Sequence, residues 1–386
     1  MNNIDDINAL AYADDIVLLS KSKEGLQKAL DIVEEYCRKW RLKVNQSKTK
    51  TMIFSRGNRI INAEFKINGN ALENVKEFKY LGIIVHKKNC TFTPSLKYLR
   101  LKATRAFYAL KSKVNVYKLP LKVALKLIDS TIKPILLYCS EVWEPFLNQD
   151  ADKWDKENVI EKAYLEFIKQ LLGVNRSTTN AMVRGELDRH SLQEEILRRN
   201  INYTKYLHQK DVSWHVKQAY LFELTRDPSC ITLFRSIDHH AAELHRIHGQ
   251  FLPYANPYEN LYKISYPKLK LLTYQLFHNE WVKKLSSSPK ADTYRKIKAG
   301  MKYEKYLDHP IRKERVCMTK LRTSDHKLMI EEQRHYRPKP PRPERTCYVC
   351  HDKVEDEIHF LTECNLYGFY NRHWGGYMIT SPWLPH

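Results

Sequence analysis

Two adjacent carboxylates near the start of the chain, Asp14 and Asp15, have the clearest chemical potential in this sequence. The apolar runs at residues 9–12 and 16–19 suit β-structure, whereas the acidic pair favours a turn, so we expect a β-hairpin with both acids at its tip. Carboxylates held in this way can bind Mg²⁺, and two such ions about 3.5–4 Å apart serve nucleotidyl transfer. The pair alone is far more often an ordinary surface turn, because two-residue matches are common by chance.

A second group of residues with metal-binding chemistry lies near the other end of the chain. Its pattern is Cys347-x2-Cys350-x8-His359-x4-Cys364. Three thiolates and one imidazole form a closed tetrahedral set, which suits a structural Zn²⁺. His351 is an alternative ligand, but we favour His359 because the apolar residues after it provide a packed base. A stiff, basic, Pro-rich spacer at residues 337–343 precedes the group.

Positive charge dominates the composition. The chain of 386 residues has 65 Lys and Arg against 44 Asp and Glu, a formal net charge of +21. Such a surface attracts polyanions, and salt weakens the attraction. Residues 78–128 contain no Asp or Glu at all. Within them, apolar residues repeat at helical spacing, so we expect a helix that packs on one side and presents cations for nucleic-acid phosphates on the other, namely Lys97, Arg100 and Arg105.

The elements around the acidic pair follow from similar patterns. Ser22 can cap a helix whose apolar positions predict its packed face: Leu26, Leu30, Val33, Cys37 and Trp40. Residues 42–54 then predict an edge strand, and Lys48 and Lys50 lie within it. Lysines at the start of a strand are usually only solvated charges.

The string Tyr12-Ala13-Asp14-Asp15 between its two apolar runs resembles the Tyr-x-Asp-Asp signature of reverse transcriptases, most closely the form found in non-LTR retrotransposons. The resemblance implies that Asp14 is the principal Mg²⁺ ligand and that Asp15 assists it. It also implies that Tyr12 and the small Ala13 lie where primer and template approach the metals.

Three further segments resemble the same family, in the same order along the chain. Asn45, Lys48, Thr49 and Lys50 are similar to its Asn-x-x-Lys-Thr-Lys element, which implies that Lys48 or Lys50 neutralises phosphate charge beside the incoming nucleotide. Phe78-Lys-Tyr80-Leu-Gly82 is similar to its primer-grip hairpin, and the basic helix that follows occupies the place of its thumb. The Cys347–Cys364 pattern resembles the Cys-Cys-His-Cys element that ends non-LTR retrotransposon polyproteins.

These patterns predict an α+β chain of four parts. Residues 1–90 form a partial palm with the acidic hairpin and primer-grip-like strands, and residues 91–150 a basic helical thumb. Residues 151–336 form a mostly helical connection, and residues 337–386 the Pro-rich spacer and zinc element. No apolar run approaches the ~18–20 residues of a membrane span, and no signal peptide is evident. The eight cysteines fit a reducing compartment, so we expect an intracellular protein of the nucleus or cytoplasm with no membrane partner.

The resemblance implies RNA-directed DNA synthesis with two Mg²⁺ ions, an RNA template and a DNA primer or target. Polymerases of this family take a further metal-binding Asp from a strand well upstream, whereas only eleven residues precede Tyr12 here, so we expect an incomplete polymerase. One alternative is an inactive RNA- or DNA-binding remnant with a structural zinc site. Another is a zinc-dependent interaction protein with no nucleic-acid role.

Overall fold

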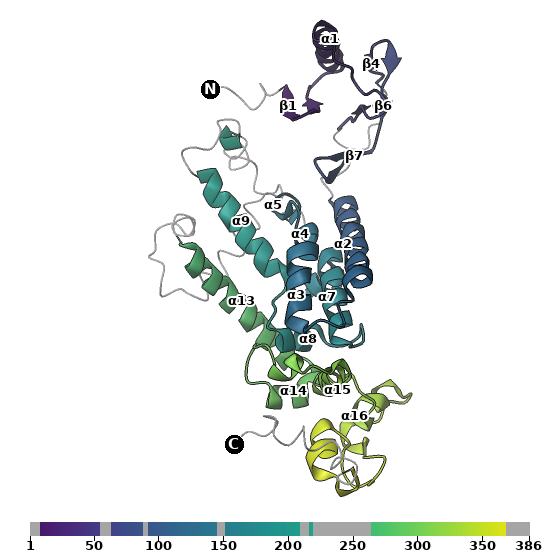
Figure 1. The fold of residues 1–386 in the computed structure, drawn as a ribbon, viewed down its shortest axis with the longest axis vertical. Helices are drawn as coiled ribbons and strands as arrows, with labels where there is room; N and C mark the ends of the chain where they lie inside the picture. The colour runs from purple at the N-terminus through teal and green to yellow at the C-terminus, as the bar shows by residue number, and fades with distance from the viewer. Residues whose placement is uncertain are drawn as a thin grey trace. The chain divides into compact units, whose positions relative to one another are not determined.

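The structure is a computed structural model that describes residues 8–54, 63–87, 92–144, 151–208, 216–218 and 264–367 (Figure 1). The chain divides into two compact units. The first comprises Met1–Tyr98, Cys139–Asn148 and Arg199–His240, and the second Leu99–Tyr138, Gln149–Arg198 and Ala241–His386. Small sheets lie in the first unit and helices dominate the second, which agrees at this level with the predicted α+β class.

The first unit contains four two-stranded sheets in the described residues. The antiparallel pairs are β1 (Ala9–Tyr12) with β2 (Asp15–Leu18), β4 (Lys66–Ile67) with β5 (Asn70–Ala71), and β7 (Glu77–Tyr80) with β8 (Ile83–His86). The parallel pair is β3 (Lys50–Thr51) with β6 (Glu73–Asn74). The predicted strand at residues 42–54 is therefore reduced to the two residues of β3.

Helix α1 (Lys23–Lys39) supports the first hairpin. Ser22 caps it, because its Oγ accepts a hydrogen bond from the Gly25 N–H at 3.0 Å. The Gln27 amide bonds both the N–H and the C=O of Lys66, which fixes α1 to β4. A small core of Leu30, Phe65, Ile67 and Leu72 fills the space beneath, with Leu18 and Leu26 packed against it.

Trp40 does not belong to the packed face of α1, contrary to our prediction. Its side chain is 60% exposed. The helix ends at Lys39, and Trp40 is the C-cap with φ −95° and ψ 8°. Helical spacing no longer sets the direction of a side chain once the helix has ended. The other predicted positions of this face are buried or half-buried.

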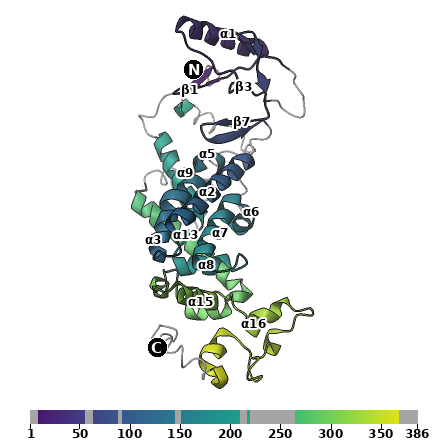
Figure 2. The same ribbon diagram turned by 45° about the vertical axis from the view of Figure 1, so that its right-hand side comes forward.

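The second unit is a helical assembly (Figure 2). Helix α2 (Thr93–Val114) starts in the first unit, and in the second unit its Phe107 ring stacks on the Phe167 ring of α7. The other principal elements of the second unit are α3 (Leu121–Leu127), η2 (Ile128–Ile132), α4 (Lys133–Leu136), α6 (Ala151–Glu157), α7 (Val159–Leu172), α8 (Asn180–Leu187), α9 (Leu192–His208), α13 (Tyr266–Ser286), α14 (Asp292–Ile297), α15 (Arg312–Arg322) and α16 (Met329–Glu332). Helix α9 runs on into the first unit, which also holds α5 (Ser140–Trp143). In the described part of the chain no helix has the length and apolar character needed to cross a membrane.

Buried ion pairs join the helices of the second unit. Glu161 of α7 is fully buried, and it accepts hydrogen bonds from Trp154 Nε1 of α6, from the Leu192 N–H at the start of α9 and from Arg184 of α8. Arg184 also forms a bidentate pair with Asp155 of α6, at 2.8 and 2.7 Å. These contacts bring four helices together around one carboxylate.

Candidate functional site

The acidic hairpin has a tighter turn than we predicted. Ala13 and Asp14 form the turn, with Ala13 at φ 53°, and Asp15 is already the first residue of β2, opposite Tyr12. Cross-strand partners share a face of a sheet, so Tyr12 and Asp15 lie on one face and Leu18, which packs on the core, on the other. Both carboxylates and the Tyr12 ring are exposed, which leaves this end of the hairpin accessible.

The two aspartates have no third acidic partner among the described residues. The part of the chain that the structure describes holds one group of three or more metal-ligand side chains within reach of a single ion, and that group is the C-terminal Cys and His set. Asp14 and Asp15 alone therefore offer carboxylate oxygens of the type that Mg²⁺ prefers, but do not form a closed site by themselves.

The two lysines of the third motif have different surroundings. Lys50 Nζ lies 2.6 Å from Glu73 Oε2 across the β3–β6 pair. Lys48 is exposed, and its N–H bonds the backbone and side-chain oxygens of Asn45 at 3.2 Å each, so the Asn fixes a turn just before β3. Lys48 is thus the better placed of the two to meet a phosphate.

The primer-grip-like segment is a separate hairpin in the described residues. Tyr80 is half-buried opposite Ile83, and the turn between them has Leu81 at φ 46° and Gly82 at φ 85°. Two successive left-handed residues make a type I′ turn, which explains the need for a glycine here. Ser95 at the start of α2 bonds the N–H and the C=O of Ile84 at 2.8 and 2.7 Å, which holds the hairpin against that helix.

The basic helix has the two-sided character that its sequence predicts. Leu99, Ala103 and Phe107 are buried on one side, whereas Lys97 and Arg105 are exposed on the other. Arg100 is half-buried, and its guanidinium lies 3.5 Å from Glu166 of α7. Lys97 and Arg105 are therefore more available to a polyanion than Arg100.

The four predicted zinc ligands come together. Their ligand atoms all lie within 4.8 Å of one another, as a single ion in a tetrahedral site requires: Cys347, Cys350, His359 and Cys364. His359 Nε2 lies 3.3 Å from Cys350 Sγ, and His359 Nδ1 lies 3.6 Å from Glu363 Oε2. Nε2 thus faces the sulfurs, while Nδ1 is buried without a hydrogen-bond partner among the described residues and has the Glu363 carboxylate as a neighbour. The donor set fits Zn²⁺.

Local hydrogen bonds shape the two halves of this site. Cys347 and Cys350 flank a tight turn in which the Cys347 N–H donates to the Lys353 carbonyl at 2.7 Å, and His351 takes a left-handed φ of 57°. The backbone N–H of Asp352 lowers the pKa of the Cys350 thiol to about 6, whereas burial raises the pKa of Cys347 to about 11. A thiolate is the form that binds metal, so the turn favours ligation at Cys350.

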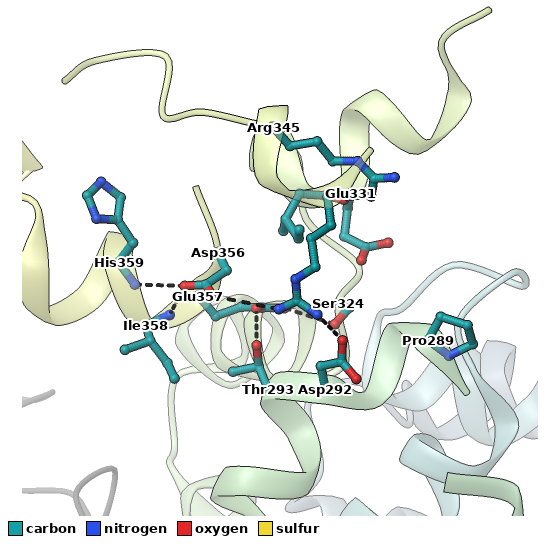
Figure 3. Close-up of polar contacts among 12 residues, drawn as sticks. Pro289, Asp292, Thr293, Ser324, Glu331, Arg345, Asp356, Glu357, Ile358 and His359 are labelled. Carbon is teal, nitrogen blue, oxygen red and sulfur yellow. Dashed lines mark hydrogen bonds and ion pairs between the residues drawn. The ribbon is translucent and has the colours of Figure 1, made fainter. Parts of the chain in front are cut away.

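The second half of the site is a helical turn that starts at Asp356. Its Oδ1 accepts the N–H groups of Ile358 and His359 at 3.1 and 2.9 Å, and η8 (His359–Glu363) then leads to Cys364 (Figure 3). Glu357, in the same turn, is buried and points away from His359 toward Thr293 of α14 (Figure 3). Sequence reasoning missed Glu357 and Glu363, because no local pattern distinguishes a supporting carboxylate from a solvated one.

Comparison with known proteins gives a consistent set of relatives. Residues 1–85 match the family described as reverse transcriptase (RNA-dependent DNA polymerase). The chain is 28% identical over 209 residues to the "Probable RNA-directed DNA polymerase from transposon BS" of Drosophila melanogaster, covering 51% of this chain and 22% of that protein. It is 30% identical over 142 residues to the RNA-directed DNA polymerase from mobile element jockey of Drosophila funebris, covering 34% and 15%.

A transposon-derived protein of Caenorhabditis elegans is 29% identical over 143 residues, which is 36% of this chain and 49% of the nematode protein. The aligned part of the chain thus spans less than half the length of each of these relatives. No solved structure matches the chain significantly. Residues 1–85 thus match the reverse transcriptase family, and the two fly relatives that are similar to longer stretches of the chain are named as RNA-directed DNA polymerases of mobile elements.

Proposed function

We propose that this chain contributes palm and thumb elements to an RNA-directed DNA polymerase, in which Asp14 and Asp15 bind the catalytic magnesium. The observation that carries the proposal is the hairpin itself. It lies within the family match, and its turn and the first residue after it present two exposed carboxylates beside an exposed tyrosine. Bound Mg²⁺ would neutralise charge on the attacking and leaving oxygens of an in-line displacement.

The remaining roles follow from position and charge. Lys48, exposed at the turn before β3, would neutralise phosphate charge, while Lys50 would mainly hold β3 to β6 through Glu73. The Tyr80–Gly82 turn would support the primer strand. Lys97 and Arg105 would contact the backbone of an RNA template paired with a DNA primer, with a smaller contribution from Arg100.

The test is Mg²⁺-dependent primer extension on an RNA template by a longer polymerase, in which this chain is joined to upstream segments that supply the further metal-binding Asp, combined with a measurement of template–primer binding. Asp14→Asn should abolish extension and Asp15→Asn should reduce it, because each removes a charged ligand while leaving the size of the side chain unchanged. Asp31→Asn is the matched control, since Asp31 is an exposed carboxylate on the neighbouring helix α1. Extension that survives Asp14→Asn would refute the proposed role of the hairpin.

A second candidate is a nucleic-acid-binding protein without polymerase activity. The observation that favours it is the lack of a third carboxylate near Asp14 and Asp15 among the described residues. The same two measurements separate the candidates. Binding without extension, unchanged by Asp14→Asn, would support the second.

For the C-terminal element we propose a structural Zn²⁺ site formed by Cys347, Cys350, His359 and Cys364. Its support is the convergence of four ligand atoms of the chemistry that zinc prefers. Cobalt(II) added to the metal-free full-length chain should give the strong visible absorption of a tetrahedral thiolate site, and zinc should displace it. Cys350→Ser should weaken this spectrum, whereas Cys317→Ser, at an exposed cysteine of α15, should leave it unchanged.

A further inference from the structure

We propose that zinc binding also stabilises helix α14 and the turn after α15, because Glu357 connects the metal site to both. The inference rests on the proposed zinc site and extends it. It assigns Glu357 a positioning role between the metal-binding element and the helical part of the second unit.

The contacts of Glu357 come from segments far apart in the sequence. Its carboxylate is only 4% exposed. Thr293 of α14 donates its hydroxyl to one carboxylate oxygen at 2.6 Å (Figure 3). The other oxygen lies 2.9 Å from the Ser324 hydroxyl and 2.9 Å from His326 Nε2. Three donors therefore satisfy one buried carboxylate, which would otherwise be costly to remove from water.

The geometry of one helical turn links this carboxylate to the metal. Glu357 lies two residues before His359, and residues two apart on a helix point about 200° apart. Asp356 fixes the turn by accepting the N–H groups of Ile358 and His359. The same rigid turn thus holds a metal ligand on one side and the Glu357 contact on the other (Figure 3).

A second buried carboxylate joins the cysteine half of the element to α16. Glu355 is 1% exposed and accepts the Met329 N–H at 2.7 Å, and its carbonyl accepts the Ile330 N–H at 3.2 Å. Arg345 returns a hydrogen bond to the Ile330 carbonyl at 2.9 Å. Both halves of the metal site are therefore attached to residues 289–331, so the described residues 337–367 are not an independent segment behind a stiff spacer.

Zinc binding and the attachment of the metal-binding element to α14 and α16, which we call docking, stabilise each other. Without the ion, an exposed ion pair between Lys353 and Glu363 at 3.2 Å still joins the two halves, but exposed pairs contribute little, so the ligand atoms lose the strongest interaction that they share. The backbone at Glu357 and Glu355 would then no longer be fixed, and both carboxylates would lose hydrogen bonds to their donors. If zinc stabilises the docked state, docking must raise zinc affinity by the same factor.

The experiment measures hydrogen exchange of the full-length chain with zinc and after its removal by a chelator. We expect faster exchange in α14 and in residues 323–331 after removal, with α1 unchanged as an internal reference. Zinc-loaded Glu357→Ala should reproduce the faster exchange, and the milder Glu357→Gln should give a smaller effect. Glu344→Gln is the matched control, because Glu344 is an exposed carboxylate of the same element.

A second measurement approaches the coupling from the opposite side. Thr293→Val combined with Ser324→Ala removes two donors at positions remote in sequence from every ligand, and should weaken zinc binding about 10-fold in competition with a chelator. If cobalt(II) fails to bind, the zinc site itself is wrong. If cobalt(II) binds but zinc removal leaves the exchange of α14 unchanged, or the double variant binds zinc normally, the site stands and the coupling is overturned.

Discussion

At the scale of single residues, His190 is an imidazole kept neutral by its surroundings. Its ring lies 4.7 Å from the Tyr274 ring, edge to face, and its Nε2 is buried without a hydrogen-bond partner in the described part of the chain. Burial lowers its pKa to about 4, and the nearby charges of Arg184, His278 and Arg198 act in the same direction. A proton on this ring would be an uncompensated charge next to other cations.

This environment predicts acid sensitivity of the second unit. An unfolded histidine has a pKa near 6.5, so between about pH 6.5 and pH 4 the unfolded state binds more protons, and stability falls as the pH falls, by at most ~1.4 kcal/mol per pH unit. His190→Phe should reduce the difference between urea midpoints at pH 7 and pH 5. His335→Phe, at an exposed histidine, should not. Equal pH dependence in both variants would show that His190 is not the group responsible.

The sequence identified residues whose partners are close in the chain or regularly spaced. Asp14 and Asp15 are adjacent, and the steps Cys347-x2-Cys350 and His359-x4-Cys364 predicted a cluster whose ligand atoms do come together. Glu357 could not be identified in this way, because Thr293 and Ser324 are remote in sequence and offer only common hydroxyls. Tertiary contacts of this kind leave no periodic signal.

At the scale of elements, helix α2 combines a buried stripe with a cationic face. Periodicity predicted this stripe correctly, because a long helix repeats the same face over several turns. Periodicity does not predict the direction of a side chain beyond the last residue of a helix, as the exposed Trp40 after α1 shows. Periodicity also could not identify Glu166 as the partner of Arg100, because the two residues come from different helices.

The cationic face of α2 carries a prediction about nucleic-acid binding. Lys97→Ala with Arg105→Ala should weaken binding to any sequence. The slope of log affinity against log salt should fall by about 0.7–0.9 for each phosphate that the protein no longer neutralises. The control is Lys302→Ala with Lys305→Ala, which removes the same amount of charge from exposed residues outside α2. If both pairs of changes lower the slope equally, net charge and not the α2 face governs binding.

At the scale of the whole molecule, buried and half-buried pairs of opposite charge hold distant segments of the second unit together. Arg184 with Asp155, Arg189 with Asp129 and Arg322 with Glu186 join positions 29, 60 and 136 residues apart in the sequence. The charges of the first and third pairs have lost most of their water, so each of them depends on its partner. The sequence shows these residues but not their pairing, which is why the predicted helical connection had no internal arrangement until the structure supplied one.

The pair of Arg322 and Glu186 allows this dependence to be measured. The Arg322 guanidinium donates to both carboxylate oxygens at 2.9 and 3.1 Å, and Tyr306 adds a hydrogen bond of 2.6 Å. Glu186 is fully buried, so Arg322→Met should leave an unpaired buried charge and cost about 3–5 kcal/mol of unfolding free energy.

Lys122→Met is the control for that measurement, because Lys122 and Asp308 form an exposed ion pair in the same unit, where the loss should stay below about 1 kcal/mol. Arg322→Met combined with Glu186→Gln should recover part of the loss, since a neutral amide is less costly to bury than an unpaired carboxylate. Urea unfolding of the four proteins tests this order. A loss for Arg322→Met no larger than that for Lys122→Met would mean that burial of Glu186 does not make its partner essential, and that packing alone holds the second unit together.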